Sequence, residues 1–289
     1  MRLVTYKDST GVHVGALRGE VVVALDSVAP DMLALIDQGA AGLAAAAAVL
    51  ASNAPAQPLA AVTLLAPIPR PRQNVVCVGM NYVAHAIESD RARGREPKLP
   101  AVPVFFTKAV TTVVGPDVDF VLDPAVTLEL DYEVELAFVI GRRGKNIPRG
   151  QALDYVFGYT IANDISARDL QGNHQQFFKG KSLDGSCPLG PCIVTADEIP
   201  DPAALTVSLT LNGERRQHSS TGDLIFDVPT LIEYLSAGMT LEPGTIVSTG
   251  TPSGVGLGYN PPQYMKAGDV MVAAIAGIGE LRTRVVSAR

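Results

Sequence analysis

Acidic and apolar residues alternate from Leu128 to Leu136, in the segment LELDYEVEL. If this segment is one strand, its four carboxylates share a face, because successive side chains of a strand point to opposite sides. Carboxylates two positions apart lie about 6.5 Å from each other and repel unless a cation lies between them. The four are Glu129, Asp131, Glu133 and Glu135. Neighbouring hard oxygen ligands of this kind suit Mg2+, Mn2+ or Ca2+.

The alternative interpretation of this alternation is the solvated face of an amphipathic strand. The continuation argues against it, because Ala137 to Ile140 are apolar up to Gly141 and predict a strand that enters the interior. Ionised carboxylates persist there only when they are paired or coordinate a cation. The sequence therefore favours a metal site, for which two glutamates alone are too few ligands.

His85 and Glu88 form a second candidate for chemistry. They lie three positions apart in a helix-compatible segment, 81–89, so that a helix would place them on one face. The charged segment that follows, up to Pro100, is interrupted by glycine and proline and favours a lid. A carboxylate that holds the imidazole tautomer can help it to deprotonate water. The alternatives are a structural histidine and a surface charge; a serine nucleophile is unsupported because no Gly-x-Ser-x-Gly motif is present.

A glycine-rich segment, 250–258, follows an expected strand at 245–249. It matches neither the P-loop nor the dinucleotide-binding pattern, which argues against nucleotide binding. We expect its backbone to approach a small ligand closely and to offer peptide N–H groups to a carboxylate or oxyanion. The alternative is a glycine-rich turn.

The elements that position these residues are mainly strands. Residues 2–25 predict three short strands, 30–36 and 40–51 predict helices, and the proline-rich segment 53–71 predicts a linker. We therefore divide the chain into a small N-terminal domain, 1–70, and a catalytic domain, 71–289. Expected further elements are strands at 73–79, 104–106, 155–162, 206–211, 214–217, 245–249, 269–276 and 281–286 and a helix at 229–235, with Asn212-Gly213 as a hairpin turn. The fold class is α+β, predominantly β.

Composition limits the partners. The net charge of -6 and the lack of any Lys or Arg run longer than two argue against nucleic acid. The apolar runs are too short to span a membrane, and the first residues do not resemble a signal peptide. An odd number of cysteines, 3, without a CxxC pair predicts reduced thiols in the cytoplasm.

Six segments resemble the fumarylacetoacetate hydrolase superfamily, in order and in spacing, over about residues 70 to 285. They are VGMNYVAHAIES, FFTK, LDYEVELAFVIG, GYTIANDISARDLQ, KGKSLDGSCPLGP and STGTPSGVG. The chain is similar to the acylpyruvase-like and 2-hydroxyhepta-2,4-diene-1,7-dioate isomerase-like members. The resemblance implies a catalytic domain folded as a mixed β-sandwich roll, a smaller N-terminal α+β domain and a homodimer.

The same resemblance implies roles for individual residues. Glu133, Glu135 and Asp164 would bind Mg2+ or Mn2+, with Ca2+ as another possible ion. His85, Glu88 and Lys181 would be catalytic. The candidates for substrate contact are Tyr82, Lys108, Arg168, Gln171, Gly250 and Thr251.

One position departs from the family pattern. Several members carry a basic residue where this chain has Met80, so that a second, distal carboxylate of a substrate has one partner fewer. This counts against a dicarboxylate such as fumarylpyruvate. Lys108, Arg91 and Arg93 are possible replacements that the sequence does not place.

The resemblance predicts a hydrolase that cleaves a C–C bond of 2,4-diketo acids. Water activated by His85 and Glu88 would attack the distal carbonyl of the metal-bound acid, and the pyruvate enolate would leave, stabilised by the metal and Lys181. Alternatives on the same site are decarboxylation of oxaloacetate-like acids, tautomerisation of 2-hydroxydienoates and dehydration of keto-deoxy sugar acids. An alternative of another class is a non-catalytic protein that binds small oxo acids.

Overall fold

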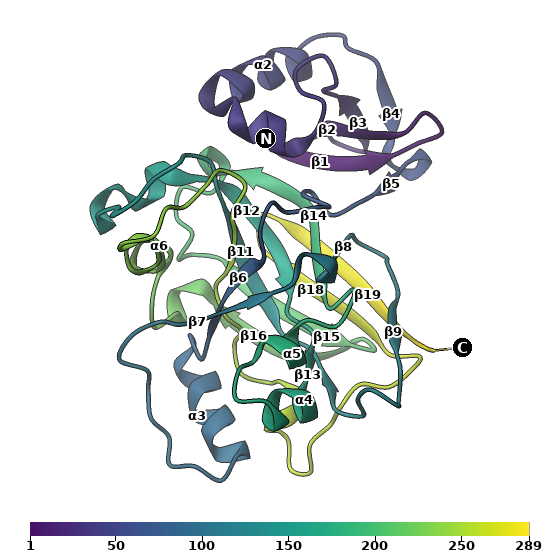
Figure 1. Ribbon diagram of the computed structural model, residues 1–289. Helices are drawn as coiled ribbons and strands as arrows, with labels where there is room; N and C mark the ends of the chain where they lie inside the picture. Colours follow the sequence, from purple (N-terminus) through teal and green to yellow (C-terminus); the bar gives the residue numbers. More distant parts are fainter. Residues whose placement is uncertain (289) are drawn as a thin grey trace.

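The computed structural model describes residues 1–288, and Figure 1 shows a small N-terminal unit beside a larger β-rich body. The N-terminal unit confirms the three expected strands and two helices. Residues 53–71, expected as a linker, also contribute two short strands to it. Its elements are β1 (Arg2–Lys7), β2 (Val12–Arg18), β3 (Val21–Ala24), α1 (Met32–Asp37), α2 (Gly39–Ala51), β4 (Ala56–Pro58), the 3-10 turn η1 (Leu59–Ala61) and β5 (Thr63–Leu64).

The larger body contributes further strands to the same sheet. They are β6 (Val75–Gly79), β7 (Val104–Lys108), β8 (Val113–Val114), β11 (Val134–Ile140), β12 (Val156–Asn163), β14 (Cys187–Thr195) and β17 (Ile246–Ser248). The main order is β4-β3-β2-β1-β14-β12-β11-β17-β6-β7. The two units share a sheet because β1 pairs with β14, Leu3 opposite Ile193. The division near residue 70 stays a prediction.

A second sheet packs against the first and completes a mixed β fold, as expected. Its order is β16-β15-β18-β19-β9. The bounds are β9 (Phe120–Leu122), β15 (Thr206–Leu211), β16 (Glu214–Ser220), β18 (Val270–Ile275) and β19 (Gly279–Ser287). The expected hairpin joins β15 to β16, with Asn212 and Gly213 both at positive φ, the geometry that an Asn-Gly turn favours.

Helices and 3-10 turns lie around the two sheets. The helices are α3 (Val83–Ala92), α4 (Arg168–Asn173), α5 (Phe178–Lys181) and α6 (Val228–Ser236). The 3-10 turns are η2 (Val110–Thr112), η3 (Arg149–Tyr155), η4 (Ala196–Glu198), η5 (Thr221–Asp223) and η6 (Gly256–Gly258). In Figure 1, α3 lies at the end of the molecule opposite the N-terminal unit, near α4 and α5.

Strand β11 explains where the core lies. Leu136, Phe138 and Ile140 belong to the apolar cluster that includes the second sheet, whereas Ala137 and Val139 belong to the cluster that includes α1 and α2. Both faces of this strand are buried, which confirms the prediction from its unbroken apolar run. Carboxylates at its start therefore lie in a dry environment.

The expected single strand over 128–136 is wrong in one respect, because it is broken before Val134. Residues Leu130–Asp131 form β10, which pairs with β13 (Ser166–Ala167) in a separate two-stranded sheet. The backbone N–H of Tyr132 donates to the side-chain Oδ1 of Asp131, and the backbone N–H of Glu133 donates to the side-chain Oδ1 of Asn163. Side chains thus replace the ladder at the break.

Strand β14 was missed altogether, although it is central. It contains Pro188 and Pro191, and proline argues against a central strand because it cannot donate to the ladder. The register between β12 and β14 shifts between Tyr159 and Ile161, opposite this proline-containing segment. The sequence signal for an interior strand is weak where prolines interrupt it.

Candidate active site

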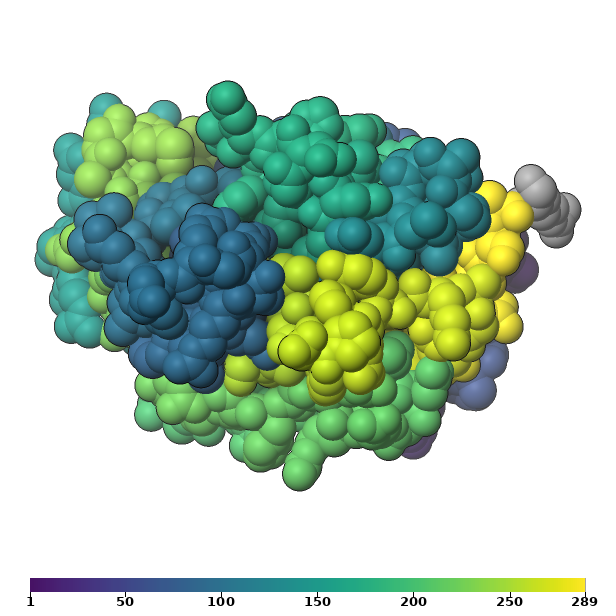
Figure 2. Space-filling view, turned by 90° about the horizontal axis from the view of Figure 1, so that it is seen from below, coloured from purple at the N-terminus to yellow at the C-terminus, as the bar shows by residue number. Residues whose placement is uncertain are grey.

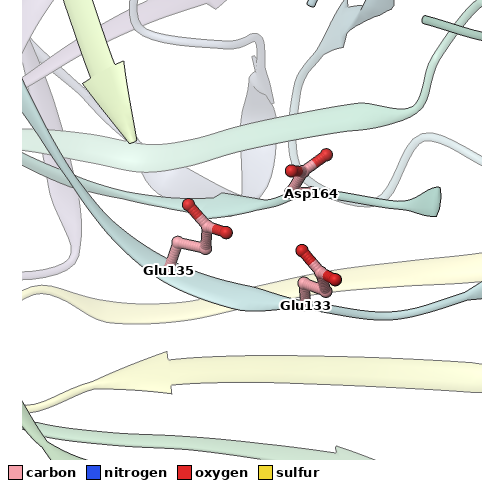
Figure 3. Close-up of side chains that lie close together, drawn as sticks. All are labelled: Glu133, Glu135 and Asp164. Carbon is pink, nitrogen blue, oxygen red and sulfur yellow. The ribbon is translucent and has the colours of Figure 1, made fainter. Parts of the chain in front are cut away.

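Glu133, Glu135 and Asp164 come together where β11 begins and β12 ends, in the middle of the large sheet. Each offers one carboxylate oxygen, and these atoms lie within 4.8 Å of one another. Figure 3 shows Glu133 and Glu135 extending from one strand and Asp164 from its neighbour toward a common space. The β11–β12 register places them, because Val134 lies opposite Asn163 and the Asp164 N–H donates to the Glu133 carbonyl. The three predicted ligands thus form one buried cluster.

Cations surround two of these carboxylates. Lys181 Nζ lies 2.7 Å from Glu133 Oε2 and 2.8 Å from Asp164 Oδ2. Lys108 Nζ, fully buried, lies 2.7 Å from Asp164 Oδ1. Arg168 Nη2 lies 2.7 Å from Glu133 Oε1 as a close ion pair. Burial alone would raise the pKa of Glu133, but the charges of Lys181 and Arg168 hold it well below its usual range.

Glu135 differs, because it has no cationic partner in residues 1–288. Its Oε2 accepts hydrogen bonds from Ser248 Oγ at 2.5 Å and from Gly250 N–H at 2.9 Å. Burial, and then the negative charges of Asp164 and Glu133, raise the pKa of Glu135 to about 8. A divalent cation would remove this repulsion, and three buried carboxylate oxygens are donors that Mg2+ or Mn2+ accepts. The residues present therefore fit such an ion.

Arg168 is held by a second buried ion pair, which the sequence did not predict. Its Nε lies 2.8 Å from Asp131 Oδ2, and its Nη1 donates to Gln171 Oε1 at 3.1 Å. Asp131 thus lies beside the cluster and positions Arg168. Burial opposes the charge of the guanidinium, yet Asp131 and Glu133 raise the pKa of Arg168 above its usual value.

The His–Glu pair lies on α3, as predicted. His85 Nδ1 lies 3.2 Å from Glu88 Oε2, and Glu88 Oε1 accepts from the Gly254 N–H at 2.9 Å. Asn81 fastens the start of this helix, since its amide donates to the carbonyls of Phe226 and Thr249. Hydrogen bonds at Asn81 and at Glu88 therefore connect α3 to the body of the protein.

The backbone N–H groups of the glycine-rich loop donate to the protein's own carboxylates, which differs from the expectation that a ligand would use them. Gly250 donates to Glu135, Gly254 to Glu88, and Gly256 and Leu257 to Asp131. Gly250 has φ +99, a conformation that L side chains rarely adopt, and an added Cβ would lie 2.9 Å from the Cβ of Asn81. The loop orients acids of the site.

A pocket of about 30 Å³ lies between α3 and the carboxylates. Its polar lining includes His85 and Ser89, four residues apart on one face of α3, and Arg93, which directly follows the helix. Its apolar lining includes Phe106 and Phe177, whose rings meet edge to face at 5.6 Å. This volume is about that of one water molecule. Figure 2 shows the face where α3 and the loop after it, in blue, border the segment around η6, in yellow.

The other predicted residues divide into two groups. Arg168, Gln171, Lys181 and Thr251 line the pocket with His85. Thr251 is also a brace, because its hydroxyl donates to the Val134 carbonyl. Lys108 lies on Asp164 and does not line the pocket, and the buried Tyr82 lines a different one. Their predicted roles in substrate contact are untested.

Asp131 was one of the four alternating carboxylates, but its pairing with Arg168 was not predicted. Ser89, Ser248 and Phe177 were not predicted to lie at the site. The spacing His85-Ser89-Arg93 was available as a signal, since residues four apart share a helix face. Phe177 and Ser248 carry no such signal, because they reach the site through tertiary packing.

The three carboxylates are buried and lie together, which excludes the solvated strand face. Residues 74–286 match the family model described as fumarylacetoacetate (FAA) hydrolase C-terminal. The chain therefore belongs to the fumarylacetoacetate hydrolase family and is an enzyme. This confirms the resemblance seen in its motifs.

The chain is similar to several characterised proteins. It is 50% identical to the oxaloacetate tautomerase YisK of Bacillus subtilis (strain 168) over 227 residues, which cover 78% of this chain and 74% of YisK. The fumarylacetoacetate hydrolase of Exiguobacterium antarcticum has a TM-score of 0.86 at 40% identity, covering 100% of both chains. The maleylpyruvate hydrolase of Sphingobium sp. SYK-6, solved with manganese(II) and pyruvate, has a TM-score of 0.82 at 31% identity and the same coverage.

The described helices include none that is long and apolar enough to cross a membrane. The three cysteines are free and buried, as their spacing predicted. The predicted cytoplasmic location and homodimer stay predictions.

Proposed function

We propose that the protein is a metal-dependent tautomerase that interconverts the keto and enol forms of oxaloacetate. The single observation that carries this proposal is the enclosure of one proton-transfer group, His85, over a buried carboxylate triad. Keto–enol exchange requires only that a proton leave the carbon next to the carbonyl and that another reach the carbonyl oxygen. No bond between heavy atoms breaks, so one base above the bound acid suffices.

Glu133, Glu135 and Asp164 would hold Mg2+ or Mn2+. When bound, such an ion polarises the 2-oxo group of a substrate and so makes the neighbouring C–H more acidic. Lys181 adds positive charge on the same side, because it lies against two of the three carboxylates. Arg168, held by Asp131, presents a fixed cation to the acid.

His85 would move the proton at C3. Its Nδ1 is taken by Glu88, which leaves Nε2 as the nitrogen that can exchange a proton with substrate. Both oxygens of Glu88 are hydrogen-bonded, one to His85 and one to Gly254 N–H, so Glu88 holds the imidazole rather than acting as a separate base. The pair thus works as one base, which suits enolisation.

The similarity to YisK supports this choice, since that relative is named an oxaloacetate tautomerase and is 50% identical. The proposal replaces C–C hydrolysis as the first choice because hydrolysis needs a positioned water and a proton donor for the leaving carbon as well.

Hydrolysis of 2,4-diketo acids of the acylpyruvate and fumarylpyruvate class is the second candidate. The similarity to maleylpyruvate hydrolase over the whole chain favours it. In that reaction His85 would deprotonate water instead of C3. Decarboxylation of oxaloacetate would use the same bound acid and release pyruvate.

The experiment starts from oxaloacetate in its enol form. Metal-stripped protein, with and without Mg2+ or Mn2+, is mixed with it, and the loss of enol absorbance is followed in the ultraviolet. Pyruvate release from oxaloacetate and loss of a simple acylpyruvate are measured in parallel. We expect metal-dependent acceleration of enol loss without equivalent pyruvate release. Cleavage of the acylpyruvate with no effect on the enol would overturn the proposal in favour of the hydrolase.

A further inference from the structure

Arg93 is a cation without a matching anion at the wall of the active-site pocket. It follows α3 directly and lines the pocket with His85 and Glu133. Within the described chain it forms no ion pair, and its partners are neutral: Ser89 Oγ, and Gln171 Oε1 at 3.5 Å from its Nη2. The other cations of the pocket, Arg168 and Lys181, are paired with acids. A half-buried guanidinium without an acid is arranged to receive one.

A second observation points to an anion at the same place. Gln171 Oε1 accepts from Arg168 Nη1 at 3.1 Å and lies 3.5 Å from Arg93 Nη2. Two guanidinium groups thus converge on one neutral oxygen, and their like charges repel. A carboxylate between them would relieve that repulsion, and guanidinium matches carboxylate geometry with two hydrogen bonds.

Lys108 and Arg91 are not placed to bind an anion in this pocket. Lys108 is fully buried and used by Asp164 and the Ile165 carbonyl. Arg91 is exposed and lines a separate hollow with Leu257 and Tyr259. Met80, which lines the active-site pocket, brings no charge.

We propose that Arg93, with Gln171 and Ser89, binds the distal carboxylate of a four-carbon 2-oxo dicarboxylic acid and so selects dicarboxylates over monocarboxylates. This inference rests on the proposed function for the identity of the acid. It selects Arg93 from the three basic residues that were named as possible replacements for the partner missing at Met80. Arg93 is a specificity residue rather than a base, because a guanidinium stays protonated.

The first test uses binding and needs no turnover. Malate and 2-hydroxybutanoate differ in a terminal carboxylate against a methyl group, and neither can enolise as a 2-oxo acid does. Calorimetry on the Mg2+-loaded protein should show that malate binds at least about 10-fold more tightly. Arg93→Gln should remove that preference, and Arg93→Lys should keep part of it. Arg91→Gln is the matched control, since Arg91 lies outside the pocket, and should keep it all.

The second test uses the reaction. Arg93→Gln should lower kcat/KM for oxaloacetate by about 10- to 100-fold. Exchange of the C3 protons of 2-oxobutanoate for deuterium, followed by NMR, should change less than about 3-fold, since that acid has no group for Arg93 to bind.

The outcomes separate the two proposals. Equal affinities for malate and 2-hydroxybutanoate in the wild-type protein, or an unchanged preference in Arg93→Gln, would overturn the role of Arg93. A preference that Arg93→Gln abolishes, in a protein without tautomerase activity, would keep the role of Arg93 and overturn the proposed reaction. Melting temperatures of the variants show whether each is folded.

Discussion

The floor and the lid of the active-site pocket are built differently. The floor consists of Glu133, Glu135 and Asp164 with their cations, and every one of these carboxylates is buried and bonded by at least two groups. The lid is α3 with the loop after it, and its pair, His85 and Glu88, is tied to the body through one hydrogen bond from Gly254. The residues between Arg93 and Pro103 form no helix or strand.

This difference indicates separate roles for the floor and the lid. A fixed floor holds its charges in place before a ligand arrives, as electrostatic preorganisation requires. A lid with few tethers can move to admit an acid and then bring His85 and Arg93 over it. Binding of a cation should therefore depend on the floor alone, whereas turnover and choice of acid should depend on the lid as well.

The largest expected effect comes from the floor. Glu135→Gln removes one charged ligand but keeps the volume of the side chain and an oxygen for Ser248 and Gly250. We expect Mn2+ affinity to fall about 100-fold or more and turnover to fall at least as far. Calorimetry with Mn2+ and the enol assay measure the two quantities. Glu129→Gln, in the same segment but partly exposed, is the control; an unchanged Mn2+ affinity in Glu135→Gln would count against the floor as the metal site.

A substitution in the lid should lower turnover without lowering the affinity for Mn2+. His85→Gln removes the base, and general-base catalysis typically contributes about 100- to 10,000-fold. We therefore expect turnover to fall within that range while Mn2+ affinity stays within about 2-fold, since His85 is not a floor ligand. If the variant retains near-normal turnover, His85 is not the proton-transfer group.

A support of the floor should matter less than the floor itself. Ser248→Ala removes one of the two hydrogen bonds to Glu135 Oε2 and leaves that from Gly250. Loss of such an outer partner typically weakens metal binding about 10- to 100-fold, and we expect the lower end. Calorimetry checks this against Ser253→Ala, whose side chain lines another pocket. If Ser248→Ala and Ser253→Ala changed the Mn2+ affinity equally, the hydrogen bond from Ser248 to Glu135 would have no specific role in metal binding.

The smallest effect is expected from an exposed charge group far from both regions. His13 on β2 lies 2.9 Å from Asp26, and the hydrogen bond to Asp26 raises the pKa of His13 above its usual value. A raised folded pKa stabilises the protein at pH below the unfolded value, near 6.5, and this stability is lost as pH rises through the folded value. Because His13 is solvent-exposed in part, the contribution should stay below about 1 kcal/mol.

Urea unfolding of the wild type and of His13→Gln, measured from below pH 6 to above the folded pKa of His13, gives the difference in unfolding free energy at each pH. A loss of stability of the variant that is larger above the folded pKa than below pH 6 would contradict the assignment. Turnover should be unchanged, because none of the N-terminal strands β1 to β5 lines the pocket.

Short-range patterns in the sequence predicted part of the candidate site, whereas Asp164 was expected from the family resemblance alone. Alternation along one strand predicted that Glu133 and Glu135 lie together, and a spacing of three predicted the contact of His85 with Glu88. The break before Val134 could not be foreseen, since it depends on Asn163 in another strand. The use of loop amides by Glu88 and Asp131 likewise depends on tertiary contacts.

The basic residue proposed to bind a distal carboxylate was harder to predict for the same reason. The sequence alone does not distinguish Arg91, Arg93 and Lys108 in this role. In the folded chain Lys108 is buried and bonded to Asp164, whereas Arg93 lines the pocket. Strand β14 was missed because its prolines hide a central strand whose partners are distant in sequence.

The measurement that tests the division between floor and lid most directly is anomalous X-ray scattering from crystals grown with Mn2+. Wild type and His85→Ala should both show a single strong peak among the carboxylates of Glu133, Glu135 and Asp164. The absence of that peak, or its loss when His85 is changed, would contradict a metal site that belongs to the floor alone.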